Sequence, residues 1–172
     1  VYDEKAIQEM GLEAYYSVAK GSDNPPRFIV LRHKGGDGET LALVGKGLCY
    51  DSGGYAIKSA GGMYTMHADM GGAGAVLGAM KFLAETEAPV NVTAIVAACE
   101  NMLSGKSYKN GDIIDSLSGK TIEVVNTDAE GRVTLADGVT YAAQNEKADY
   151  IIDIATLTGA VVSALGGDMT GV

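Results

Sequence analysis

Two kinds of hydrophobic spacing alternate along the chain. Short runs rich in apolar residues, typical of buried strands, occupy residues 28–31, 41–44, 90–99, 121–125 and 150–154. Apolar positions at helical spacing occupy residues 3–20, 71–85, 133–145 and 159–165. The glycine-rich turn at 35–38 predicts a hairpin between the first two strands, and strands and helices alternate after it. This order predicts an α/β fold with a mixed, largely parallel sheet flanked by helices on both faces.

Size and composition limit the classes of protein to consider. A chain of 172 residues, 47% hydrophobic and 20% charged, has the length and composition of one soluble globular domain. The net charge of −9 argues against a nucleic-acid partner bound through a basic face. The apolar stretch at 150–165 is interrupted by Asp153 and Gly159 and is short for a membrane span, so no membrane association is expected. Cys49 and Cys99 lie in apolar runs and are interpreted as buried, reduced thiols of a cytoplasmic protein.

The segment Asn-Thr-Asp-Ala-Glu-Gly-Arg at residues 126–132 is the strongest candidate for chemistry. It places the carboxylates of Asp128 and Glu130 and the guanidinium of Arg132 within five residues. Carboxylates two positions apart on a loop can direct their oxygens to one point, and hard divalent cations prefer oxygen ligands. The arginine could hold an anion beside them. An alternative is that both acids simply favour the dipole of a helix that begins near Arg132.

A second polar group follows the strand at 41–44. Lys46 and Asp51 lie in the glycine-rich segment 45–54, whose spacing does not match a phosphate-binding loop. Taken singly, Lys46 is typical of a surface lysine and Asp51 of a turn residue. Since the carboxyl ends of parallel strands meet at one edge of a sheet, we expect Asp51, Glu100 and Asp128 near that edge.

Two further residues have an ordinary interpretation when taken alone. Lys58 fits a surface charge, and Asp69 fits the N-cap of the helix that begins at Gly71. The only histidines, His33 and His67, lack the spacing of a metal-binding pair. Any cation must therefore be held mainly by carboxylates.

Taken together, these motifs closely resemble the leucyl aminopeptidase family of dinuclear metallopeptidases. Two blocks carry the resemblance, VGKGLCYDSGG at 44–54 and NTDAEGR at 126–132, together with Lys58 and Asp69. Shorter segments at 66–72, 99–102 and 153–159 are similar to the same family. The similarity runs over essentially the whole chain. It implies that residues 1–172 form part of the catalytic domain, without the family's separate N-terminal domain and C-terminal remainder.

The resemblance assigns a ligand set for two divalent ions, Mn²⁺ or Zn²⁺. The metal ligands it implies are Lys46, Asp51, Asp69, Asp128 and Glu130. Asp51 and Glu130 would bridge the ions, Lys46 and Asp69 would complete the tighter site, and Asp128 would complete the more exchangeable one. Lys46 would have to bind as a neutral amine, with its pKa driven far down.

The remaining roles concern the reaction. The resemblance implies that Lys58 stabilises the developing oxyanion, that Arg132 holds a bicarbonate acting as general base, and that Met66 and Ala129 line the substrate pocket. The implied protein is a cytoplasmic, metal-dependent aminopeptidase. It would release leucine and other apolar N-terminal residues from peptides by means of a water activated by two metals, and family members assemble as hexamers.

Two other interpretations remain open. The chain could be an inactive truncated fragment, or a metal-binding scaffold, of such an enzyme. A phosphatase or nuclease with carboxylate-bound metals is disfavoured by the acidic charge and by the spacing of Lys46 and Lys58.

Overall fold

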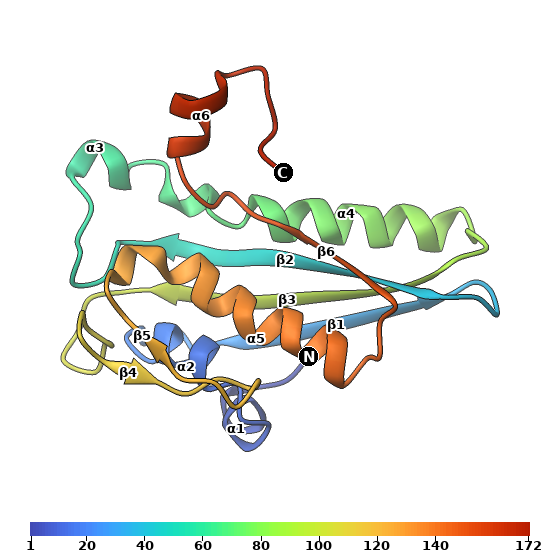
Figure 1. Cartoon of the computed structure of the whole chain (residues 1–172), viewed down its shortest axis with the longest axis horizontal. Coiled ribbons are helices and arrows are strands. Elements are labelled where there is room, and N and C mark those ends of the chain that lie inside the picture. The colour runs from blue at the N-terminus through green and yellow to red at the C-terminus, as the bar shows by residue number, and fades with distance from the viewer.

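A four-stranded mixed sheet organises the protein, and the computed structural model describes all of residues 1–172 (Figure 1). Its strands are β1 (Arg27–Lys34), β2 (Thr40–Asp51), β3 (Asn91–Asn101) and β6 (Tyr150–Ile154). They are arranged in the order β1-β3-β2-β6. The β2–β3 and β2–β6 pairs are parallel, and the β1–β3 pair is antiparallel.

Helices cover both faces of this sheet. Helix α4 (Gly71–Glu85) lies on one face, and α2 (Glu13–Ala19) and α5 (Glu130–Gln144) lie on the other, with α1 (Glu4–Glu9) farther out (Figure 1). The remaining elements are short: α3 (Ala60–Met63), η1 (Met66–Ala68), β4 (Ile113–Ile114), β5 (Ile122–Glu123), η2 (Thr127–Ala129) and α6 (Ala160–Leu165). The predicted α/β fold, with a mixed sheet and helices on both faces, is confirmed. None of the helices is both long and apolar enough to cross a membrane.

The central strand β3 contributes to two hydrophobic cores. Val92, Ala94 and Val96 pack with α4, whereas Ile95 and Ala97 belong to the larger core that α2 and α5 cover. Successive side chains of a strand point to opposite faces, so a strand covered on both sides requires an unbroken apolar run. This explains why residues 94–99 are apolar without a break.

The predicted hairpin between β1 and β2 is wrong, because β3 lies between these strands. Ala94 of β3 pairs with Leu31 on one side and with Leu43 on the other. The connecting loop crosses the start of β3, where Asn91 holds it: the Asn91 Nδ2 donates to Gly38 O at 2.8 Å, and its Oδ1 accepts from Gly36 N. The turn residues correctly indicated that the chain reverses direction between β1 and β2. The most apolar strand, β3, nevertheless lies between these two strands.

Two other segments differ from their prediction. Residues 3–20 form two helices, because Gly11 adopts φ +73° just after α1, a conformation that ends a right-handed helix. The run at 121–125 contributes only Ile122–Glu123 to a two-stranded ribbon with β4. The segment that leads to Asp128 is therefore not a strand of the main sheet.

The β2–β3 register shifts by one residue at Cys49. Cys49 is exposed and Cys99 is buried, and both are free thiols. The prediction that both thiols are buried is wrong for Cys49, since the extra residue of a bulge leaves the ladder and turns outward.

A buried carboxylate joins α5 to the start of α2. Asp137 is fully buried and accepts hydrogen bonds from Tyr15 N at 2.9 Å and Leu117 N at 2.8 Å. Helix α2 has no side-chain cap of its own, so Asp137 satisfies one of its free N–H groups from a distant helix. Burial raises the pKa of Asp137, and the backbone N–H donors oppose that effect.

We predict that Asp137→Asn destabilises the protein by about 1–3 kcal/mol, because one buried N–H loses its acceptor and faces an amide N–H₂ instead. Urea denaturation measures this change. Asp149→Asn is the matched control, since the exposed Asp149 also accepts a backbone N–H, that of Thr40. Equal losses in the two variants would contradict the assigned role of burial.

Candidate metal centre

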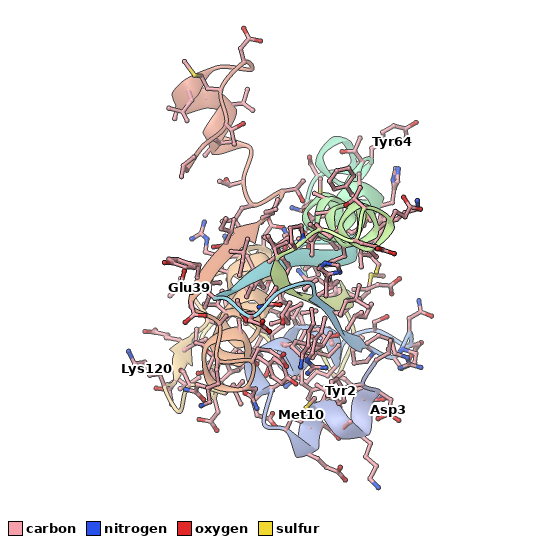
Figure 2. All side chains as sticks on the ribbon, turned by 90° about the vertical axis from the view of Figure 1, so that its right-hand side faces the viewer. Tyr2, Asp3, Met10, Glu39, Tyr64 and Lys120 are labelled. Atoms are coloured by element: carbon pink, nitrogen blue, oxygen red, sulfur yellow. The ribbon has the colours of Figure 1, made fainter.

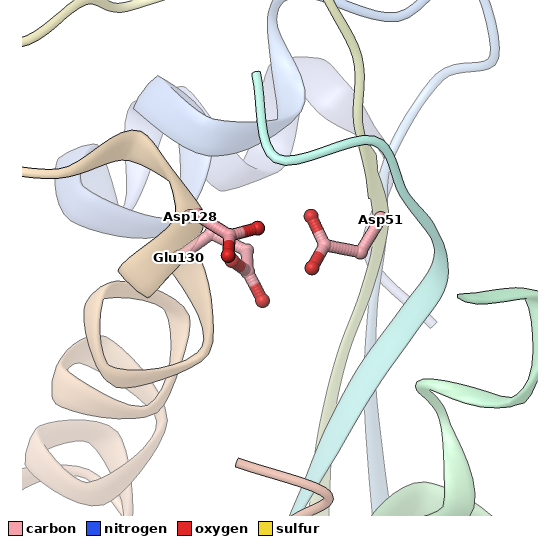
Figure 3. A group of neighbouring side chains, drawn as sticks. All are labelled: Asp51, Asp128 and Glu130. Carbon is pink, nitrogen blue, oxygen red and sulfur yellow. The ribbon is translucent and has the colours of Figure 1, made fainter. Parts of the chain in front are cut away.

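Three carboxylates converge at the carboxyl-terminal edge of the sheet. Asp51 ends β2, Asp128 lies in η2, and Glu130 begins α5. One oxygen from each lies within 4.8 Å of the others, and Figure 3 shows the Asp51 carboxylate facing the other two across a short gap. Oxygen atoms gathered at this spacing are what a hard divalent cation requires.

The register shift at Cys49 explains why Asp51 joins Lys46 in this cluster. Side chains five residues apart on a regular strand point to opposite faces of the sheet. The extra residue at Cys49 shifts this alternation by one, so the side chains of Lys46 and Asp51 point to the same face of the sheet. Lys46 and Asp51 can therefore both contribute to a cluster built around Glu130.

Lys46 is buried among oxygen atoms, so the surface interpretation is wrong for it. Its side chain is 3% exposed, and its Nζ lies 2.8 Å from Asp69 Oδ2 and 2.9 Å from Glu130 Oε1. The Nζ also donates to the carbonyl of Thr156 at 3.2 Å. Gly131 permits this approach, because a Cβ at that position would lie 2.7 Å from the Lys46 Cε.

Lys58 forms a second bridge on the more open side of the cluster. Its Nζ lies 2.7 Å from Asp128 Oδ1 and 3.0 Å from Asp51 Oδ2. The Lys58 side chain is 18% exposed, so its ammonium borders the cluster and remains within reach of solvent. The surface interpretation therefore fails for Lys58 as well.

The local interpretations of the acids are only partly correct. Met70, not Asp69, occupies the N-cap of α4; Asp69 Oδ1 instead accepts a hydrogen bond from Thr156 Oγ1 at 2.8 Å. Helix α5 begins at Glu130 rather than near Arg132, and Glu130 lies in its first turn as the dipole interpretation requires. Glu100 takes no part in the cluster and accepts from Ser22 Oγ at 2.6 Å.

Sequence reasoning missed four polar residues that form hydrogen bonds in the segments around the cluster: Asn101, Tyr108, Thr127 and Thr156. Asn101, Tyr108 and Thr127 are buried. Three of the four lie inside segments noted for their resemblance, but no spacing rule assigned them a contact. Thr127 is an example, because it forms hydrogen bonds between segments that are distant in the sequence. Its Oγ1 donates to Gly53 O at 2.8 Å and accepts from Ala56 N at 2.8 Å. It thereby joins the loop after β2 to the loop before α5.

The other predicted residues border this region. Arg132 is exposed in the first turn of α5, and its side chain forms no hydrogen bond or ion pair. Met66 in η1 and Ala129 in η2 are half-buried. The side chains of these three residues form none of the ion pairs of the acidic cluster, although the Met66 carbonyl accepts a hydrogen bond from Asp69 N.

Burial and charge act against each other at the cluster. Burial raises the pKa of Glu130 to about 7, with Lys46 opposing and Asp51 adding to the effect. Burial also raises the pKa of Asp69, against the influence of Lys46. For Lys46 itself, burial favours the neutral amine, but Glu130 and Asp69 outweigh it and raise its pKa. The cluster thus favours the protonated forms of its carboxyl groups, and it favours cations placed among them.

One buried oxygen provides a test of whether a metal fits. Glu130 is 1% exposed, and its Oε2 has no hydrogen-bond partner. A buried carboxylate oxygen without a donor costs free energy unless a cation satisfies it. The donor set, which consists of carboxylates and one lysine nitrogen, fits a divalent cation.

The whole chain, residues 1–172, matches the cytosol aminopeptidase family, catalytic domain. The chain belongs to this family. Probable cytosol aminopeptidases of Clostridium perfringens and Clostridium tetani are 59% and 58% identical to it over 100% and 99% of its length. The chain covers only 36% of either relative, so it spans about a third of their length.

Solved structures of cytosol aminopeptidase relatives agree with this fold. Leucine aminopeptidase of Caenorhabditis elegans has a TM-score of 0.92 at 44% identity, covering 95% of this chain and 34% of its own. Leucyl aminopeptidase of Trypanosoma brucei, solved in complex with bestatin, has a TM-score of 0.92 at 42% identity, covering 96% and 32%. The predicted resemblance to this family is confirmed.

The raised pKa of Glu130 predicts how pH affects this cytosol aminopeptidase domain without metal. Between its ordinary pKa of 4.5 and its folded value of about 7, the folded state binds a proton that the unfolded state has lost. Stability should therefore fall as pH rises through that window, by about 3 kcal/mol in total. Urea denaturation at a series of pH values in the presence of a chelator measures the slope.

Glu130→Gln provides the control for this pH effect, because it removes the Glu130 carboxyl group and should reduce the slope to the part that Asp69 and Asp137, whose pKa values burial also raises, contribute. A wild-type slope that persists unchanged in the variant would show that another group titrates.

Proposed function

We propose that this chain carries the dinuclear metal centre of a metal-dependent aminopeptidase. The observation that supports this most directly is the convergence of all five ligand candidates in one cluster. Lys46 lies against Asp69 and Glu130, and Glu130 lies against Asp51 and Asp128. Residues separated by many positions in the sequence thus lie close together, which supports the ligand set that the family resemblance implies.

The contacts of each group support the ligand roles that the family resemblance implies. Glu130 directs Oε1 to the Lys46 side and leaves Oε2 without a partner, which suits a carboxylate that bridges two ions. Asp69 and Lys46 would complete the more buried ion, and Asp128 the more exposed one, since Asp128 is the least buried of the acids. Asp51 would bridge with Glu130.

Two bound cations, Mn²⁺ or Zn²⁺, would supply Lewis acidity that activates water and polarises the scissile carbonyl. The chain's own contribution to the transition state is the Lys58 ammonium. Asp51 and Asp128 raise the pKa of Lys58 against the effect of burial, so it stays charged. A charged donor held at the border of the site can stabilise an oxyanion that develops there.

Three further roles complete the proposal. Arg132 is exposed and free of protein partners, so it can hold a bicarbonate that accepts a proton in place of a side-chain base. Met66 and Ala129, half-buried on the neighbouring loops, would line the pocket for the first side chain of the peptide. The family's leucyl aminopeptidases suggest leucine and other apolar residues as substrates.

We also propose where this activity takes place and which molecules take part. The chain would act as part of the catalytic domain of a longer cytoplasmic enzyme that assembles as a hexamer. Peptides would be its partners, with no nucleic acid or membrane involved. The acidic net charge of −9 is consistent with this choice of partners.

We predict that the wild-type chain binds two Mn²⁺ or Zn²⁺ ions and that Asp51→Asn lowers this number, because a bridging carboxylate serves both sites. Isothermal titration calorimetry gives the stoichiometry. Asp115→Asn, an exposed acid outside the cluster, controls for the change of charge. If Asp51→Asn still bound two ions with the wild-type affinity, the ligand assignment would be wrong.

Lys58→Ala should reduce hydrolysis of leucyl peptides by about 10²–10³-fold, as loss of one oxyanion donor does, with the fold retained. Turnover assays in the presence of Mn²⁺ measure the loss. Lys81→Ala, which removes an exposed lysine of α4, is the control. Near-normal turnover in Lys58→Ala would refute its role. Stoichiometric metal without turnover in the wild type would favour the scaffold interpretation.

A further inference from the structure

Asn101 lies behind the metal centre and joins its two halves. It ends β3 directly beside Asp51, its partner in the parallel ladder. The Asn101 Nδ2 donates to Asp51 Oδ1 at 2.8 Å and to the carbonyl of Thr127 at 3.0 Å. One amide group thus connects the last residue of β2 to the loop that carries Asp128 and Glu130.

The orientation of this amide is fixed by chemistry. A carboxylate oxygen and a backbone carbonyl only accept hydrogen bonds, and the two hydrogens of Nδ2 match them one to one. A flipped amide would place Oδ1 against both acceptors. The Asn101 side chain is 0% exposed, so water cannot serve as an alternative hydrogen-bond partner for the amide.

This orientation of the amide leaves its oxygen unsatisfied, which costs free energy. Asn101 Oδ1 is buried and has no hydrogen-bond partner. An unsatisfied buried acceptor costs on the order of 1–3 kcal/mol. A residue that served only to fill space at this position could avoid the cost with an apolar side chain of similar volume.

The contacts of Asn101 also define which oxygen of Asp51 stays available. Asp51 Oδ1 accepts from both Asn101 Nδ2 and Gly53 N, the latter at 2.9 Å. Its Oδ2 faces Lys58 and no backbone donor. The amide therefore holds the Asp51 carboxylate in one rotamer, with Oδ2 turned toward Lys58, which also contacts Asp128.

We propose that Asn101 is the positioning residue that sets the gap between Asp51 and the Asp128–Glu130 loop, and so pre-forms the metal centre. This inference rests on the proposed function. Groups that orient metal ligands by hydrogen bonds typically change metal affinity by about 10–100-fold when removed. Asn101 acts through Asp51 and Thr127 and has no direct role in the reaction.

Tyr108 offers a matched control. Its hydroxyl donates to the same Thr127 carbonyl at 2.8 Å, and the side chain is 1% exposed. Tyr108→Phe removes a buried hydrogen bond from the loop but leaves the contact between Asn101 and Asp51 intact. A general loosening of the loop would affect both variants, whereas positioning of Asp51 requires Asn101 alone.

The experiment compares Asn101→Ala, Asn101→Ser and Tyr108→Phe with the wild-type chain. Calorimetry gives the Mn²⁺ dissociation constants, electron paramagnetic resonance reports the magnetic coupling between bridged Mn²⁺ ions, and urea denaturation in a chelator gives stability. The serine variant retains one donor for the buried acceptors, so it remains informative if the alanine variant fails to fold.

Both Asn101 variants should weaken Mn²⁺ binding by about 10–100-fold and diminish the coupled signal, whereas Tyr108→Phe should bind Mn²⁺ within about threefold of the wild-type affinity. A folded Asn101 variant with wild-type affinity and coupling would overturn the inference and leave the proposed function standing. Equal weakening by Tyr108→Phe would also overturn it. A wild-type chain that binds no Mn²⁺ would refute the proposed function and this assignment with it.

Discussion

Four carboxylates held close together around two lysine ammoniums set the main constraint on this structure. Lys46 neutralises Asp69 and Glu130, and Lys58 neutralises Asp51 and Asp128. Taking such charges out of water is costly unless each has a close partner. Because the acids come from separate segments, satisfying them requires the loop after β2, the start of α4 and the start of α5 to meet at one edge of the sheet. Negative charge remains in excess, which is why a cation fits there.

The sheet meets this requirement by small local features rather than by a special fold. The register shift at Cys49 returns Asp51 to the Lys46 side of β2. Gly131 leaves room for the Lys46 side chain where α5 begins. Asn101 and Thr127 then join the loops by hydrogen bonds that no solvent reaches. Each feature involves one residue, yet each acts on the distance between charged groups.

The sequence was a good guide to the elements and to the charged residues of the site. Helix α4 occupies the predicted residues 71–85, because its apolar positions follow helical spacing and no proline interrupts it, although four glycines lie in its first half. The pairing of strands was predicted less well, since turn residues report a change of direction but not which strand lies alongside. The roles of Asn101 and Thr156 could not be predicted either, because hydrogen bonds between distant segments follow from the tertiary structure and leave no periodic pattern.

The parallel pairing of β2 with β6 has a consequence for the time course of folding. Lys46 and the carbonyl of Thr156 that accepts its hydrogen bond are 110 residues apart in the chain. Contacts of such separation form slowly, because the loop between them must be closed first. During synthesis, Lys46 emerges long before Thr156 exists, and until β6 docks, β2 keeps an open edge. The surroundings of Lys46 are thus complete only once β6 has paired with β2.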